Sequence, residues 1–375
     1  MPHLRFRPPP SFWLNLDIPL MLTAIGLAVV GIFTLWGTAA VEGRIGPPGH
    51  EVRRQLLWMG LGVAAMATAI AFDYRATRRW TVLLYPLLMA ALLGLLIQGR
   101  RIHGAASWYV LELGGFRFQG QPSEFGKIVV VLALAVYLER RALTLRRFHH
   151  TLAPLGLAAL PAALIIRQPD LGTALVYFPP VFAMFWVAGL RKRVFALYAA
   201  LALAGAALSY PHLAEYQKER IRSYLRLGED FQGRDYNVVQ ARTALGSGQI
   251  LGKGWGQGTQ TSLRFLPEYR TDFILPAFGE QFGLIGCLAL FLAYLALLAR
   301  MVRLAARSVD LYGALLITGL ATVLGVHLFL NVGMAMGLLP VAGLPLPFLS
   351  SGGSFMLTCF LIVGLTASVG VRRAG

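Results

Sequence analysis

The sequence predicts an all-α, polytopic integral membrane protein: a helical bundle of about ten transmembrane helices with one large extracytoplasmic loop. Of its 375 residues, 57% are hydrophobic and only 14% are charged, and the mean hydropathy is +0.62. Soluble domains have about 25% charged residues. Long apolar runs recur along the chain, and they are continuously apolar rather than alternating, which favours helices over membrane strands.

Ten apolar segments approach or exceed the length of a membrane span. A helix needs about 20 apolar residues to cross a ~30 Å hydrocarbon layer. The first run is longer than the apolar core of a cleavable signal peptide, so we expect it to stay as a span. The chain, residues 1–375, is predicted to form a single membrane domain with spans at about 18–41, 55–72, 80–98, 123–139, 152–167, 171–190, 194–210, 273–299, 311–338 and 352–371.

The basic residues predict the orientation of these spans. Seventeen Lys and Arg residues fall in the segments on one side and seven in the short connections on the other, and the richer side is normally cytoplasmic. We therefore expect both termini in the cytoplasm and the loop 211–271 outside the cytoplasmic (inner) membrane. The net charge of +17 does not predict nucleic-acid binding, because the basic residues are spread between apolar runs.

Cysteine usage excludes two further kinds of site. Cys287 and Cys359 are the two cysteines, and both lie within apolar runs. The sequence therefore predicts neither a disulfide framework nor a cysteine metal site.

Three acidic residues stand at the start of the eighth span, in the stretch LPEYRTDFILPAFGEQFG. They are Glu268, Asp272 and Glu280, and carboxylates in or near hydrocarbon are costly unless paired or functional. Thr271 is a candidate helix cap, and an acid in the first turn would then complement the helix dipole. Alternatively, these carboxylates could supply a general base or bind a divalent cation.

Two other charged positions lie near the outer ends of spans. Glu124 and Lys127, in QPSEFGK, are three residues apart and share one helix face. They could form a structural ion pair that faces the bundle interior, or a site that meets an anionic headgroup. Ser123 is a candidate cap for the fourth span, and Asp170, in RQPDLGTA, for the sixth.

The outer connections carry further candidates. Trp108, in HGAASWYVLELGG, is either an ordinary interface residue or part of a site. The glycines of Gly246–Gln260 favour a shaped loop that can approach a ligand closely. The stretch GLLPVAGLPLPFLSSGGS is dense in Pro and Gly, and irregular backbone at the membrane boundary indicates a cavity lined by protein.

Taken together, these motifs resemble the SEDS family of cell-wall polymerases. The resemblance rests on GAASW, QPSEFGK, QPDLGTA, YNVVQARTALGSGQILGKGWGQGTQ, LPEYRTDFI and NVGMAMGLLPVAGLPLPFLSSGGS, in this order. It implies a peptidoglycan glycosyltransferase that polymerises lipid II into glycan strands on the outer membrane face, beside a class B penicillin-binding protein that crosslinks them. The GKGW and GTQ elements resemble the elongation branch, which implies a role in rod shape.

The resemblance also implies residue roles. Asp272 matches the essential acid of the family and would act as general base, with inversion at the anomeric carbon. From their own chemistry rather than from the resemblance, Asp272 and Glu280 are candidate ligands for Mg²⁺ or Mn²⁺. The expected substrate-binding residues are Glu124, Lys127, Trp108, Glu268, Arg270, Gln260, Lys253, Ser350 and Asn331. Three positions depart from the family pattern, Ser107 (usually Arg), Arg270 (usually His) and Ser351 (usually Tyr).

Two alternatives stay open. A flippase or other transporter for the same lipid would share the intramembrane charges and the cavity, although the chain shows no convincing internal repeat. A noncatalytic scaffold for cell-wall enzymes would tolerate neutral replacements of Asp272 and Glu124. Without the resemblance, the residues predict only a polytopic protein with an outward-facing polar site.

Overall fold

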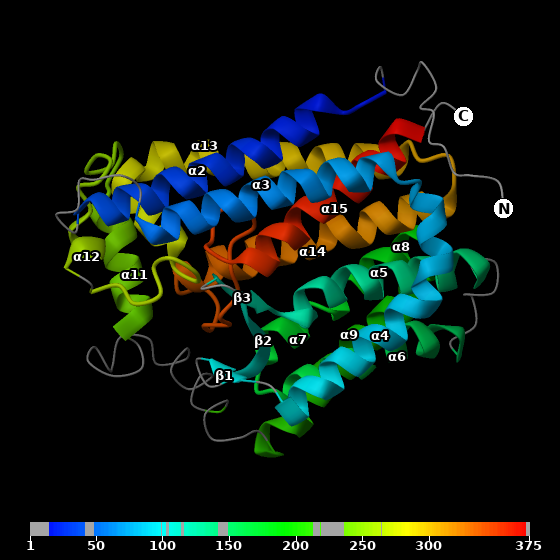
Figure 1. The fold of residues 1–375 in the computed structure, drawn as a ribbon. Coiled ribbons are helices and arrows are strands. Elements are labelled where there is room, and N and C mark those ends of the chain that lie inside the picture. Colours follow the sequence, from blue (N-terminus) through cyan, green and yellow to red (C-terminus); the bar gives the residue numbers. More distant parts are fainter. Residues whose placement is uncertain are drawn as a thin grey trace.

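The helical membrane class is confirmed (Figure 1). The computed structural model describes residues 15–41, 49–98, 100–102, 105–113, 116–141, 149–212, 218, 236–263 and 265–372. Within these ranges, seven helices are long and apolar enough to cross a membrane. They are α2 (Ile18–Val41), α3 (His50–Ala71), α4 (Thr77–Gln98), α6 (His149–Arg167), α13 (Ile274–Ala306), α14 (Leu311–Ala335) and α15 (Gly353–Val371).

The other three predicted spans also contain helices. They correspond to α5 (Pro122–Arg141), to α7 (Leu171–Leu175) with α8 (Phe178–Val187), and to α9 (Lys192–Ser209). Asp170 caps α7, because its Oδ1 accepts the backbone N–H of Thr173 at 3.0 Å. This cap was predicted. The number of ten crossings stays a prediction.

A small sheet in the connection between α4 and α5 departs from the predicted all-α content. It consists of β1 (Arg100–Ile102), β2 (Ala105–Leu113) and β3 (Phe116–Gly120), antiparallel and in that order. The Tyr109 hydroxyl donates to the carbonyl of Ala91 in α4 at 3.0 Å. On the other side, Ser354 of α15 donates to the carbonyl of Gln119 at 3.0 Å. The sheet is therefore tied to the bundle on two sides.

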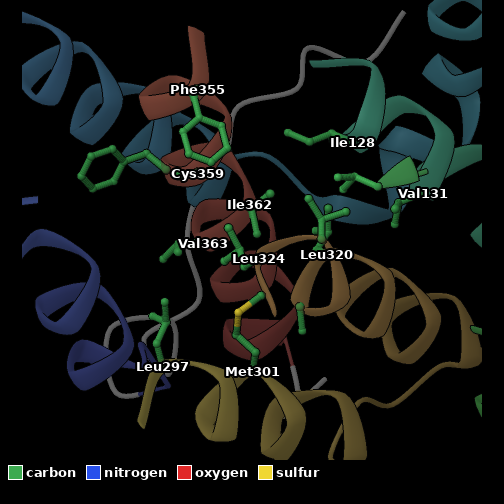
Figure 2. Packing of buried hydrophobic residues seen from close by; sticks show 14 of the residues in the cluster. Ile128, Val131, Leu297, Met301, Leu320, Leu324, Phe355, Cys359, Ile362 and Val363 are labelled. Atoms are coloured by element: carbon green, nitrogen blue, oxygen red, sulfur yellow. The ribbon is translucent and has the colours of Figure 1, made fainter. Parts of the chain in front are cut away.

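The core lies where α5, α13, α14 and α15 meet (Figure 2). Apolar side chains from all four helices interdigitate there, and most of α15 is buried inside the bundle. Because lipid is as apolar as these side chains, close packing rather than a hydrophobic driving force holds such helices together. The residues shown are Ile128, Val131, Leu297, Met301, Leu320, Leu324, Phe355, Cys359, Ile362 and Val363.

Helix α13 is broken at Gly283, whereas the sequence predicts one continuous span over 273–299. Gly283 has φ 65° and ψ −165°, a conformation that essentially only glycine adopts. A Cβ at this position would lie 2.3 Å from the backbone nitrogen of Gly252. The break therefore requires a glycine and a loop that packs directly against it.

The glycine-rich loop replaces the helical hydrogen bonds that the break removes. In a continuous helix, Leu284 and Ile285 would donate to the carbonyls of residues 280 and 281. Here they donate to the carbonyls of Gln249 and Ile250, at 2.9 and 3.1 Å. The freed carbonyls instead accept the N–H groups of Lys253 and Gly254, at 2.9 and 3.1 Å. All four backbone groups are satisfied, as the membrane environment requires.

The elements divide between two ends of the bundle. Helix α2 begins and α15 ends at one end, while α11 (Tyr236–Ser247), α12 (Thr259–Ser262) and the start of α13 lie at the other (Figure 1). Two short 3₁₀ helices, η1 (Tyr74–Ala76) and η3 (Tyr210–His212), complete the elements.

Some residues used in the predictions lie outside the described part: Arg5, Arg7, Arg44, Arg146, Arg147, Arg373, and residues 213–217, 219–235 and 264 of the large loop.

Candidate active site

Asp272 lies in a turn directly before α13, at the end of the bundle that carries α11 and α12. The turn is closed by the carbonyl of Glu268, which accepts the N–H groups of Thr271 and Phe273, both at 3.1 Å. Thr271 does not cap the helix as predicted, because the N-cap residue is Phe273 and the Thr271 hydroxyl contacts Glu268 instead. Asp272 is half-buried, and Glu268 is exposed.

The backbone of this turn is held by α14 and by the segment before α15. Three consecutive carbonyls, those of residues 270, 271 and 272, each accept a hydrogen bond from outside the turn. The donors are the Ser351 N–H at 2.8 Å, the Ser350 hydroxyl at 2.5 Å and the Asn331 Nδ2 at 2.8 Å. Ser350 and Asn331 are fully buried. Asn331 holds the carbonyl of the candidate acid itself, and Ser350 holds that of the preceding residue, Thr271, so the position of the acid is fixed.

One buried hydrogen-bond acceptor beside the turn, the Oδ1 of Asn331, has no partner among the described residues. The Nδ2 of Asn331 donates to the carbonyls of both Asp272 and Leu344, which fixes the orientation of its amide. Its Oδ1 is buried and has no protein partner among the described residues. Gly343 lies beside the acid, since a Cβ there would lie 3.6 Å from the Asp272 Oδ2.

Arg270 joins the turn to α3. Its guanidinium forms an ion pair with Glu51 and donates to the Tyr269 hydroxyl at 2.9 Å. The resemblance predicts a His at this position, and the structure shows the Arg engaged by two neighbours. Its predicted role in substrate binding stays a prediction.

The side chain of Glu280 is bound by residues of the glycine-rich loop. Its carboxylate is 0% exposed and accepts from Lys253 Nζ at 2.8 Å and from the N–H of Gln260 at 2.9 Å. The hydroxyl of Thr259 lies 3.3 Å away. These contacts place the carboxylate against the first turn of α12. The pair of Lys253 and Glu280 therefore stabilises the loop that fills the break in α13.

The two predicted metal ligands, Asp272 and Glu280, are not equally suited to bind a metal ion. An ammonium group and several N–H and O–H donors occupy the oxygens of Glu280, which leaves little room for a cation. No group of three His, Cys, Asp or Glu residues suited to a metal occurs in the described ranges. A divalent cation that involves Asp272 stays a prediction.

Glu124 and Lys127 form a buried cluster with His327. Lys127 Nζ lies 2.7 Å from Glu124 Oε2 and 2.7 Å from His327 Nε2. All three residues are at most 2% exposed. A lysine ammonium has only donors, so His327 accepts through Nε2 and is neutral. Its Nδ1 then carries the hydrogen, which points to the carbonyl of Pro345 at 3.3 Å.

This burial favours the structural interpretation of the pair over direct substrate contact. Sequence reasoning missed His327, although an ionisable residue inside the apolar run of α14 is a recognised signal. His327 precedes Asn331 by one helical turn, so both project from one face of α14. Ser123, the predicted cap of α5, has a buried hydroxyl with no partner among the described residues, so this cap prediction is wrong.

The other predicted residues lie apart from the turn. Trp108 is half-buried on β2, where it lies opposite Arg100 of β1. Gln260 lies in α12, and its Oε1 is buried without a partner among the described residues. The structure thus forms three groups: Asp272 with Asn331 and Ser350, Glu280 with the loop, and the cluster of Glu124, Lys127 and His327.

Comparisons with known proteins agree with this architecture. The family model of the FtsW, RodA and SpoVE cell cycle proteins matches residues 15–374. The peptidoglycan glycosyltransferase MrdB of Escherichia coli K12 is 33% identical over 97% of this chain and 96% of its own length. The probable peptidoglycan glycosyltransferase FtsW of Geobacter metallireducens is 34% identical over 97% of this chain and 99% of its own length.

Solved structures show the same fold. A chain of a peptidoglycan synthase complex, described as coordinating polymerization and crosslinking, has a TM-score of 0.81 and 30% identity, over 96% of this chain and 99% of that chain. The rod shape determining protein RodA of Thermus thermophilus has a TM-score of 0.70 and 27% identity, over 97% of this chain and 99% of that chain. The chain therefore belongs to the FtsW, RodA and SpoVE family, a family of multi-pass membrane proteins that the sequence motifs predicted.

Proposed function

We propose that this chain is a peptidoglycan glycosyltransferase that polymerises lipid II into glycan strands at the outer face of the cytoplasmic membrane. One observation carries the proposal: a half-buried carboxylate, that of Asp272, stands at one end of a membrane bundle on a turn whose three carbonyls are each fixed by hydrogen bonds. Relatives that match nearly the whole chain are named peptidoglycan glycosyltransferases. Such a position suits a substrate with a reactive sugar outside and a lipid tail in the bilayer.

The reaction is a single displacement. The acceptor sugar hydroxyl attacks the anomeric carbon of the donor, and its proton passes to the carboxylate of Asp272. The bond from that carbon to the pyrophosphate oxygen breaks, and the lipid pyrophosphate leaves with the electron pair. Because no covalent enzyme intermediate forms, the anomeric configuration inverts. The fixed backbone of the turn keeps the carboxylate in place, which contributes to the rate through orientation.

We propose further that a divalent cation takes part. Mg²⁺ prefers oxygen ligands and often bridges one or two carboxylates and substrate phosphates. Asp272 would supply a carboxylate oxygen, whereas Glu280 is held by Lys253. The bound ion would neutralise charge on the leaving pyrophosphate.

The first test is polymerisation of purified lipid II by the purified chain with its crosslinking partner. We expect glycan strands with Mg²⁺ or Mn²⁺ and at least a tenfold lower yield after chelation, measured by gel analysis of labelled product. Equal yields with and without the ion would contradict the cation but not the polymerase. The absence of strands in both conditions would contradict the polymerase.

A transporter for the same lipid is the second candidate, and the break in α13 favours it, since interrupted helices are typical of transporters. The two functions differ in product. A transporter moves lipid II across a vesicle membrane without changing it, whereas a polymerase makes strands from lipid II already on the outer face.

We also propose the partner and the orientation. The proposed partner of this chain is a class B penicillin-binding protein, which would crosslink the glycan strands. The similarity to a chain of a peptidoglycan synthase complex supports this proposal. Both termini would be cytoplasmic, consistent with α2 beginning and α15 ending at one end of the bundle. The GKGW and GTQ elements favour the elongation branch and a role in cell shape.

Asn331→Leu should lower kcat more than it changes KM. The replacement removes the donor to the carbonyls of Asp272 and Leu344, and a misplacement of about 1 Å can cost roughly a hundredfold in rate. Steady-state polymerisation rates check this, with Phe329→Leu on the exposed face of α14 as the control. A rise in KM at unchanged kcat would instead indicate that Asn331 binds substrate.

A further inference from the structure

The turn between α8 and α9 presents three consecutive basic residues to the surface. Arg191, Lys192 and Arg193 are all exposed. Helix α8 ends at Val187, Gly189 follows with φ 82°, and the N–H of Leu190 donates to the carbonyl of Phe185 at 3.0 Å. A hydrogen bond therefore closes the end of α8, and the three basic residues follow directly after it.

These charges are not balanced within the described part of the protein. No carboxylate there forms an ion pair with Arg191, Lys192 or Arg193. The first turn of α9 contains no acidic residue, so the positive end of the helix dipole adds to the repulsion. An arrangement of this kind is unfavourable in isolation and becomes favourable when an anion binds.

The three side chains line an open depression of the surface, of about 450 Å³. Arg guanidinium groups bind phosphate oxygens in bidentate geometry, and Lys binds them as a point charge. The chemistry of this lining therefore fits a phosphate group.

The surroundings indicate that this phosphate belongs to a lipid. Trp186 is 61% exposed one turn before the basic residues, and its ring packs edge-on against Phe195 at 5.8 Å. Tryptophan at the end of a span marks the headgroup level. Leu197 and Leu201 of α9 are 44% and 51% exposed, so acyl chains would continue along the same helix.

We propose that Arg191, Lys192 and Arg193 form a binding site for the phosphate of an anionic phospholipid headgroup. By connectivity, the turn lies at the end of the bundle where α2 begins, which is the proposed cytoplasmic side. Anionic lipids are concentrated in that leaflet and attract basic segments next to spans. The site is separate from the turn of Asp272; it rests on the proposed orientation but not on the proposed glycosyltransferase activity.

The test compares two triple variants of the full chain in detergent. Arg191→Gln, Lys192→Gln and Arg193→Gln remove the site together. Arg79→Gln, Arg303→Gln and Arg307→Gln remove three exposed cations at the same end of the bundle. The probes are dioctanoyl phosphatidylglycerol, dioctanoyl phosphatidylcholine and inorganic phosphate, with dissociation constants from microscale thermophoresis.

A basic residue that faces the anionic headgroup contributes about fivefold in affinity. We expect the site variant to bind phosphatidylglycerol at least tenfold more weakly, and the control variant to bind within about twofold of the parent. Equal losses in the two variants, or equally tight binding of phosphatidylcholine, would overturn the proposal. Displacement by inorganic phosphate at the same concentration as the lipid would assign the site to soluble phosphate and overturn the lipid assignment.

A folding control accompanies the measurement. If the site variant has a lower melting temperature, Lys192→Gln alone replaces it, with an expected loss of about fivefold in affinity. Unchanged affinity in that single variant would also count against the proposal.

Discussion

Asp272→Ala is expected to reduce lipid II polymerisation by about 10²–10⁴-fold, the usual contribution of a general base. The side chain is half-buried on a turn whose backbone contacts come from Asn331, Ser350 and Ser351. Because these contacts involve the main chain, the variant should fold and keep its melting temperature. Initial rates of strand formation by the purified variant with its partner measure the loss.

Asp73→Asn provides a matched control, because Asp73 is a half-exposed carboxylate at the opposite end of the bundle. It should retain the parent rate. Asp272→Asn keeps the shape of the side chain and should be as inactive as the alanine variant. Polymer formation by Asp272→Asn at half the parent rate or more would exclude the general base and leave the scaffold as the better interpretation.

Lys127→Met should destabilise the fold by about 3–5 kcal/mol, the usual effect of removing one partner from a buried ion pair. The variant leaves the carboxylate of Glu124 buried without its cation, and it removes the donor to His327. Glu124→Gln should cost less, because an amide oxygen can still accept from Lys127. Unfolding by denaturant in detergent micelles measures both variants.

The double variant Glu124→Gln with Lys127→Met separates the charge from the packing. It should recover part of the stability lost in Lys127→Met, since no uncompensated charge stays buried. Arg303→Met is the control for loss of an exposed cation and should have a small effect. A Lys127→Met protein as stable as its parent would show that the buried cluster does not stabilise the bundle.

The helices were predictable because long apolar runs indicate segments that lie in the membrane, and there a helix forms all of its backbone hydrogen bonds internally. The break in α13 was not, because it depends on Gly252 and Lys253, some 30 residues away. The sheet between α4 and α5 had a local signal, since YVLEL and FRFQG flank two glycines in the manner of a hairpin. We nevertheless predicted helices alone, because the composition of the whole chain is that of a helical membrane protein.

The candidate site was predictable in part for similar reasons. Asp272 stands out because a carboxylate at the edge of hydrocarbon is costly. The role of Asn331 as a backbone donor could not be predicted, because it acts on a residue 59 positions away. Glu280 was predicted to bind a cation, but in the folded protein the ammonium group of Lys253 occupies the position beside its carboxylate.

The break at Gly283 divides α13 into two mechanical parts. The loop at residues 249–254 hydrogen-bonds to both parts, because it donates to the carbonyls of residues 280 and 281 before the break and accepts from Leu284 and Ile285 after it. Because the loop holds both parts, it fixes the angle between them, and a displacement of the loop would change the direction in which the first part presents Asp272.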